Sequence, residues 1–130
     1  MIRLEEVEKI HDILIERFGG SKGIRDKGVL ESAINRPYQT FDKTDLYPTT
    51  VDKAAAIFES LISNHPFVDG NKRTGFMLAY LFLGRNGYEF EAAEGDVVIK
   101  TLAVAAGEIN EQQYAKWLES NSKPARRKAP

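Results

Sequence analysis

Residues 71–87 read NKRTGFMLAYLFLGRNG, and this stretch decides the fold. Its middle, from Phe76 to Leu83, is apolar on nearly every side. A helix of this composition is buried in the middle of a protein, because no face of it suits water. The Asn-Gly pair at positions 86 and 87 is a typical helix stop. The sequence therefore predicts a long central helix around which the other elements pack.

Five further segments have apolar residues at helical spacing on one face. On the first, this face includes His11 and Phe18. Ser, Thr, Asp and Asn side chains are good N-caps, and Asn110 with Gln113 resembles a capping box. These helices are predicted from Leu4 to the stop at Gly19-Gly20, from the N-cap Asp26 to Asn35-Arg36-Pro37, from Thr49 or Thr50 to His65-Pro66, from Val97 to Gly107, and from Asn110 through Leu118.

The segments between the helices are short. Residues 38–48 have little periodicity and are predicted to form a loop or a short β-hairpin, and residues 88–91 alternate like a brief extended piece. Residues 122–130 are basic and lack apolar periodicity, which is typical of a disordered tail. We therefore expect one all-α domain of about six helices over residues 1–121, followed by a tail at 122–130.

Composition narrows the classes of function. The chain has 130 residues, 42% of them hydrophobic and 28% charged, with a formal net charge of −1. This balance fits one globular domain and does not favour nucleic-acid binding. No cysteine is present, which excludes disulfides and thiol catalysis, and the two histidines cannot form a three-histidine metal site. No signal peptide or membrane span is evident, so we expect a cytoplasmic protein.

One segment departs from the pattern of a plain helical bundle, namely residues 65–73, HPFVDGNKR. The first N–H groups of a helix have no intrahelical partner and attract anions. Gly70 allows the backbone to approach a phosphate closely, and Lys72 and Arg73 add positive charge. A carboxylate at Asp69 beside bound phosphates would suit Mg²⁺. The segment therefore indicates an anion site.

A neutral imidazole at His65 could accept the proton of an attacking hydroxyl. Pro66 and Phe67 are interpreted as structural, holding the loop on the core. Each residue alone also has a simpler interpretation, which stays open. His65 could cap the preceding helix, Asp69 could be an N-cap, and the two basic side chains could be solvated. The co-occurrence of all these groups in one loop favours a catalytic site.

The segment resembles the catalytic motif of the Fic/Doc family. That motif reads His-x-Phe-x-(Asp/Glu)-Gly-Asn-Gly-Arg-x-x-Arg in the Fic branch, and the death-on-curing (Doc) branch has Asn-Lys-Arg at its middle. This chain has Asn71-Lys72-Arg73 and so resembles the Doc branch. Further resemblance covers most of residues 1–120: Ile10-His11-Asp12, Arg17-Phe18-Gly19-Gly20, Gly23-Ile24-Arg25-Asp26, Leu30-Glu31-Ser32-Ala33-Ile34, Leu81-Phe82-Leu83-x-x-Asn86-Gly87 and Ala105-Ala106-Gly107-Glu108-Ile109.

The resemblance implies a Fic/Doc-like bundle with His65 as general base, Asp69 as the Mg²⁺ ligand and an ATP phosphate cradle formed by Gly70, Asn71, Lys72 and Arg73. Two positions depart from the Fic pattern. Lys72 replaces the second glycine, and Phe76 stands where Fic enzymes have the second arginine, which places the terminal phosphates when AMP is transferred. These departures favour transfer of the γ-phosphate.

The resemblance implies a toxin that phosphorylates a Ser or Thr of a translation elongation factor, with elongation factor Tu as the candidate. The family's self-inhibiting pattern, (Ser/Thr)-x-x-x-Glu-(Gly/Asn), has no match, since Phe90 stands four residues before Glu94. Control by a separate Phd-like antitoxin is therefore expected. By analogy, the predicted hairpin near residues 38–47 would line the site and hold the target.

Two other functions stay open at this stage. The same residues could transfer AMP, or the fold could serve as a binding module without turnover, with the basic tail contacting nucleic acid. The pair His11-Asp12 also suggests a metal-dependent phosphohydrolase, but that chemistry needs more histidine ligands than this chain has. His11 is instead expected to pack at the inner edge of the first helix.

Overall fold

Helix α4 (Asn71–Arg85) runs through the middle of the molecule, as its apolar sequence predicts. The computed structural model describes residues 2–125 and confirms an all-α fold, with six α-helices in that range. The other helices are α1 (Leu4–Phe18), α2 (Lys27–Asn35), the short 3₁₀ helix η1 (Arg36–Tyr38), α3 (Thr50–Asn64), α5 (Glu94–Ala105) and α6 (Glu111–Ser120). Strands β1 (Thr40–Phe41) and β2 (Thr44–Asp45) form one antiparallel pair, and β3 (Tyr88–Phe90) and β4 (Ser122–Pro124) form another.

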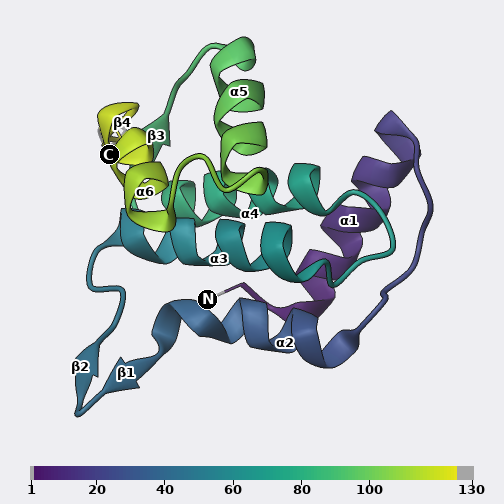
Figure 1. Cartoon of the computed structure of the whole chain (residues 1–130), viewed down its shortest axis with the longest axis horizontal. Coiled ribbons are helices and arrows are strands. Elements are labelled where there is room, and N and C mark those ends of the chain that lie inside the picture. Colours follow the sequence, from purple (N-terminus) through teal and green to yellow (C-terminus); the bar gives the residue numbers. More distant parts are fainter. Residues whose placement is uncertain (1, 126–130) are drawn as a thin grey trace, which may run out of the picture.

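Helices α3 and α4 lie side by side and antiparallel, and the remaining helices surround this pair (Figure 1). Helix α6 packs on α3, where the rings of Phe58 and Tyr114 stack with centroids 4.0 Å apart. The apolar faces predicted for α2 and α3 are buried as expected, at Leu30, Ala33, Ile34, Ala54, Ala55, Ile57, Phe58, Leu61 and Ile62.

The predicted helix caps are confirmed. The Asp26 carboxylate accepts from the Val29 N–H at 3.1 Å, and the Thr49 hydroxyl accepts from the Asp52 N–H at the same distance. Asn110 and Gln113 form the reciprocal capping box. These caps fix where α2, α3 and α6 begin, because each satisfies a first-turn N–H that has no intrahelical partner.

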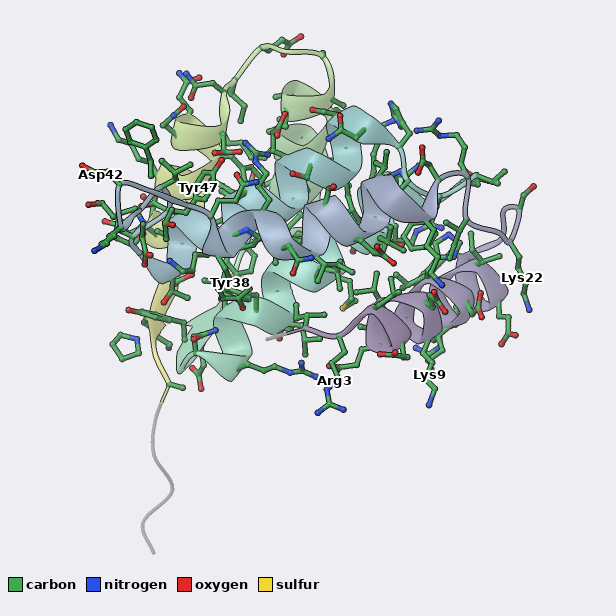
Figure 2. The ribbon with its side chains drawn as sticks, turned by 90° about the horizontal axis from the view of Figure 1, so that it is seen from below. Arg3, Lys9, Lys22, Tyr38, Asp42 and Tyr47 are labelled. Carbon is green, nitrogen blue, oxygen red and sulfur yellow. The ribbon has the colours of Figure 1, made fainter. Side chains whose placement is uncertain are left out.

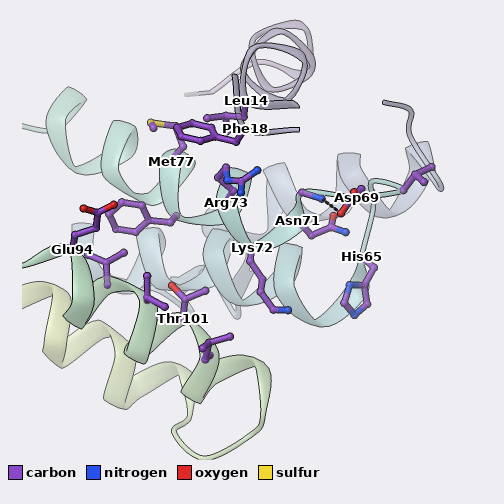
Figure 3. A pocket seen from close by; sticks show the side chains of 16 residues that line it. Leu14, Phe18, His65, Asp69, Asn71, Lys72, Arg73, Met77, Glu94 and Thr101 are labelled. Atoms are coloured by element: carbon purple, nitrogen blue, oxygen red, sulfur yellow. Dashed lines mark hydrogen bonds between the residues drawn. The ribbon is translucent and has the colours of Figure 1, made fainter. Parts of the chain in front are cut away.

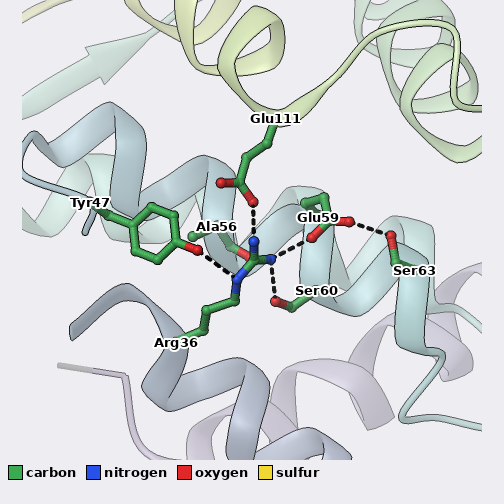
Figure 4. Close-up of polar contacts among 7 residues, drawn as sticks. All are labelled: Arg36, Tyr47, Ala56, Glu59, Ser60, Ser63 and Glu111. Atoms are coloured by element: carbon green, nitrogen blue, oxygen red, sulfur yellow. Dashed lines mark hydrogen bonds and ion pairs between the residues drawn. The ribbon is translucent and has the colours of Figure 1, made fainter. Parts of the chain in front are cut away.

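Arg36 joins η1 to three other parts of the chain (Figure 4). Its guanidinium donates to the Tyr47 hydroxyl at 2.9 Å and to Ser60 Oγ at 2.8 Å, and it also bonds Glu59 of α3. A second carboxylate, Glu111 of α6, pairs with Arg36 at 2.7 Å. Burial raises the pKa of the Glu111 carboxyl above its ordinary value, although Arg36 opposes this shift.

The predicted hairpin exists, but the expectation that it lines the motif site is wrong. Strands β1 and β2 lead directly into the first turn of α3, whereas the motif follows its last turn. A helix of 15 residues separates these two ends by about 20 Å. Figure 2 shows Asp42 and Tyr47 at one end of the molecule and Lys22 at the other.

The start of the predicted tail belongs to the folded structure. Ser122–Pro124 forms β4, which pairs with β3, and the Ala125 N–H donates to the Gly87 carbonyl at 2.8 Å. Tail residues 126–130 lie outside the described range. Within residues 2–125, no helix has the length and apolar character needed to cross a bilayer.

Candidate active site

A pocket of about 750 Å³ opens between the C-terminal end of α1, the first half of α4 and helix α5, and the sequence motif forms one wall of it (Figure 3). His65 and every residue from Val68 to Arg73 line this pocket. The opposite walls are mostly apolar. They consist of Leu14, Phe18, Phe76, Met77, Glu94, Val97, Val98, Thr101 and Leu102.

His65 stands at the point where α3 ends. It is the C-cap of that helix, with left-handed backbone angles φ 47° and ψ 61°. The cap interpretation of His65 is therefore right for its main chain, while the imidazole is exposed and faces the pocket. The C-cap position involves only the main chain, so it is compatible with the predicted use of the imidazole as a general base.

The first turn of α4 has the backbone geometry that the predicted anion site requires. Gly70 is its N-cap, with a φ of 77° that a glycine adopts easily. The first bond of the helix runs from the Thr74 N–H to the Gly70 carbonyl at 2.9 Å, so the amides of the three residues between them precede it. Lys72 and Arg73 are exposed on this turn and extend to different sides of the helix (Figure 3).

Asn71 has a structural task that the motif did not reveal. Its side chain is buried, accepts from the Phe67 N–H and donates to the Phe67 carbonyl, both at 3.0 Å. These two bonds close the turn between Phe67 and α4. The main-chain N–H of Asn71, in the first turn of α4, remains available for the predicted cradle. Pro66 and Phe67 are buried, as their predicted structural role requires.

Asp69 is fixed from three directions. Its carboxylate accepts from the Gly70 N–H at 2.9 Å and from the Ser21 N–H at 3.2 Å. Its carbonyl accepts from Nε2 of His11 at 2.7 Å, so this imidazole carries its proton on Nε2. Asp69 is not the helix N-cap, since Gly70 takes that position.

His11 packs at the inner edge of α1, as expected. Only 2% of its surface is exposed, and its ring stacks on Phe67 at a centroid distance of 3.8 Å. This buried imidazole therefore supports both Phe67 and Asp69 from below the motif. It has no access to the pocket as a proton acceptor.

The donor set near Asp69 fits one mode of Mg²⁺ binding. Among the described residues no group of three or more His, Asp or Glu side chains could enclose a metal. Mg²⁺ is commonly held by one or two carboxylates, with nucleotide phosphates and water supplying the other ligands. The lone carboxylate of Asp69 beside the first turn of α4 suits that arrangement and would not suit a resident structural metal.

The pocket also contains residues that the sequence did not single out. Phe18, predicted to face the core, is 60% exposed and lies under the Arg73 guanidinium, 4.7 Å from its ring centroid. Helix α5 contributes Glu94 and an apolar surface that includes Val98 and Leu102. The apolar character of these residues was visible in the sequence, but helical spacing alone does not distinguish a face that packs in the core from one that lines a pocket.

Comparison with known proteins gives the family of this chain. The model of the Fic/DOC family matches residues 1–83. The chain belongs to the Fic/DOC family. It is 49% identical over 80 residues to Toxin Doc of Mycolicibacterium smegmatis, and the aligned segment covers 62% of this chain and 61% of that protein. It is 35% identical over 118 residues to Protein kinase doc of Escherichia phage P1, covering 88% of this chain and 89% of that protein.

A Fido domain-containing protein of Dictyostelium discoideum is also similar, with 42% identity over 55 residues, 40% of this chain and 38% of that protein. The Doc relatives place this Fic/DOC protein in the Doc branch. The positions that depart from the Fic pattern both border the pocket, Lys72 with its ammonium and Phe76 with an aromatic ring. An aromatic ring of the pocket wall, that of Phe76, therefore stands at the motif position where the Fic pattern has its second arginine.

Proposed function

We propose that this protein is a Doc-like toxin that transfers the γ-phosphate of ATP to a Ser or Thr hydroxyl of a protein. The observation that carries the proposal is the meeting of His65, Asp69 and the first turn of α4 in one pocket. The name of the phage P1 relative, Protein kinase doc, supports the same reaction.

In this proposal, the exposed imidazole of His65 takes the proton of the acceptor hydroxyl as its oxygen attacks the γ-phosphorus. The bond from that phosphorus to the bridging oxygen breaks, and ADP leaves. The amides of the first turn of α4, with Lys72 and Arg73, bind and orient the phosphates. Asp69 would hold Mg²⁺, which neutralises phosphate charge when bound. The apolar walls limit the access of water, which would otherwise compete as the acceptor.

Transfer of AMP is the alternative that the same residues allow. Lys72 and Phe76 count against it. The ammonium of Lys72 places an extra positive charge at the start of α4, and the ring of Phe76 offers no hydrogen bond to a phosphate. A nucleotide is therefore expected to bind with its terminal phosphate toward His65.

We further propose that the target is a translation elongation factor, with elongation factor Tu as the first candidate. The proposed inhibitor is a Phd-like antitoxin. Val98, Ile99 and Leu102 of α5 are each more than half exposed and form an apolar surface beside the site. An apolar antitoxin segment on this surface would cover the pocket. Because the proposed reaction needs ATP and a translation factor, we also propose that the protein acts in the cytoplasm.

The test is incubation of the purified protein with Mg²⁺, a cell lysate and ATP labelled at either the α- or the γ-phosphate. A protein band that carries only γ-label supports the proposed reaction, and mass spectrometry of the band identifies the target. Label from the α-phosphate instead would establish AMP transfer. Purified elongation factor Tu is tested in parallel, and no label in any sample would favour a binding module.

His65→Ala is expected to lower the rate of γ-phosphate transfer by roughly 10²–10⁴-fold, the usual contribution of a general base. Nucleotide affinity should change little, since the phosphates are held by α4. Arg85→Ala is the control, because Arg85 lies at the far end of α4, where it bonds Glu6 of α1. Full activity in His65→Ala would remove His65 from the mechanism.

A further inference from the structure

His65 has a backbone conformation that its side chain disfavours. Its φ of 47° lies in the left-handed region, where the β-carbon crowds the following carbonyl. A residue stays in such a conformation only when its surroundings hold it there. Whatever holds the His65 main chain also sets the direction of the imidazole toward the pocket.

Arg25 makes the contacts that can do this. Its Nε donates to the His65 carbonyl and its Nη2 donates to the Asn64 carbonyl, both at 2.6 Å. The last carbonyls of a helix have no intrahelical partner, and the negative end of the helix dipole attracts a cation. The planar fork of a guanidinium can bond both oxygens at once, which an ammonium can do only less rigidly.

The main chain around Arg25 is itself fixed on the motif. The N–H groups of Arg25 and Asp26 both donate to the Pro66 carbonyl, at 2.7 and 3.1 Å. Ile24 forms a β-bridge with Phe67, and the Val68 N–H donates to the Gly23 carbonyl at 3.1 Å. Because Asp26 also caps α2, the base of the Arg25 side chain is tied to a helix.

We propose that Arg25 is a positioning residue for His65, which holds the left-handed end of α3 so that the imidazole faces the acceptor hydroxyl. This role rests on the proposed phosphotransfer. Arg25 itself bonds only main-chain carbonyls in the described structure and does not border the pocket. Its loss should therefore alter turnover and leave the phosphate cradle of α4 in place.

The experiment compares Arg25→Ala, Arg25→Lys and the control Arg85→Ala. Arg85 is a suitable control because its exposed guanidinium also forms hydrogen bonds, but its partner is Glu6, away from the motif. We expect Arg25→Ala to lower kcat about 10- to 100-fold, since small misplacements of a catalytic group have effects of this size. The Kd for ATP should stay within about threefold, because the bonds that hold the phosphates are unchanged. Arg25→Lys should recover part of the lost kcat, and Arg85→Ala should match the original protein.

A second readout does not depend on turnover. The chain has only two histidines, so their ring signals in a ¹H–¹³C NMR spectrum are easily assigned. In Arg25→Ala the signal of His65 should shift or broaden while that of buried His11 stays in place. The two readouts test the two proposals separately. If the unsubstituted protein transfers no phosphate, the proposed reaction is refuted, and the His65 signal still tests whether Arg25 positions the imidazole.

An unchanged His65 signal together with an unchanged kcat in Arg25→Ala would overturn the proposal. Should that variant fail to fold by circular dichroism, Arg25→Met takes its place, since methionine keeps a long side chain but removes the donors to the His65 and Asn64 carbonyls. An unchanged kcat and an unchanged His65 signal in that variant would overturn the proposal equally.

Discussion

At the scale of single residues, the site depends on two adjacent glycines with different tasks. Both Gly19 and Gly20 have positive φ, 87° and 114°. An added β-carbon at Gly20 would stand 2.7 Å from Oδ2 of Asp69, whereas one at Gly19 has no described atom within 4 Å. The first glycine is therefore needed only for its backbone, and the second also makes room for Asp69.

This difference predicts how two alanine variants should behave. Gly19→Ala should cost about 1–3 kcal/mol of folding free energy from backbone strain alone, because its φ of 87° and ψ of 172° suit only glycine. Gly20→Ala should cost at least as much and should also displace the Asp69 carboxylate. Urea denaturation measures the first effect, and the Mg²⁺ dependence of the proposed phosphotransfer measures the second.

Gly19→Ala is thus the matched control for Gly20→Ala. The interpretation would be wrong if both variants lost the same stability and kept the same Mg²⁺ dependence.

At the scale of elements, the Arg36 network sets how η1, α3 and α6 meet. One guanidinium serves two carboxylates, Glu59 and Glu111, so the cluster carries an excess negative charge when both are ionised. Desolvation raises the pKa of Glu111, and the nearby charge of Glu59 raises it further. Removing Arg36 would leave two partly buried carboxylates without a counter-ion.

Arg36→Ala should therefore lower the free energy of unfolding by about 2–3 kcal/mol at pH 7. The deficit should shrink as the pH falls toward 5. A carboxyl whose pKa is raised by folding binds its proton more readily in the folded state, and that contribution to stability is lost as the pH rises through the raised pKa. Urea denaturation of both proteins at several pH values measures the deficit.

The Arg85–Glu6 pair offers a control with a different pH window. The hydrogen bond from Arg85 lowers the pKa of Glu6 to about 2. A lowered carboxyl pKa contributes stability that is lost only as the pH falls below the ordinary value, so the deficit of Arg85→Ala should stay constant between pH 7 and 5. A pH-independent deficit in Arg36→Ala would contradict the shared-counter-ion interpretation.

The elements were predictable from sequence wherever the cause was local. Asp26, Thr49 and Asn110 cap their helices with partners three residues away, and the motif groups gather because they are contiguous. The bonds from Arg25 and His11 to the motif were not predictable, because they join residues 40 and 58 positions apart. The place of the hairpin was missed for the same reason, since periodicity does not give the direction of a helix.

At the scale of the whole molecule, the chain closes on itself through the sheet formed by β3 and β4. The ladder joins Tyr88 to Pro124 and Phe90 to Ser122, and the Glu91 N–H donates to the Asn121 carbonyl at 2.8 Å. Phe90 is buried against Trp117 at a centroid distance of 5.3 Å. The last described strand thus secures the segment that connects α4 to α5.

Truncation after Asn121 should therefore lower the melting temperature by about 5 °C, as expected for the loss of roughly 1 kcal/mol in a domain of this size. Truncation after Ala125 is the control, because it keeps every contact described above. Differential scanning calorimetry of the two truncated chains and the full chain gives the comparison. Equal melting temperatures in all three would show that the strand pairing contributes nothing to stability.

The distance along the chain between the motif and its supports also has a consequence for synthesis. His11, Ser21 and Arg25 leave the ribosome well before the loop that they hold, since 40 to 58 positions separate each from its partner. Contacts of such separation form only after the intervening chain has folded back. A nascent chain therefore cannot assemble the proposed catalytic site until the motif and the start of α4 have emerged, so the proposed activity requires the completed fold.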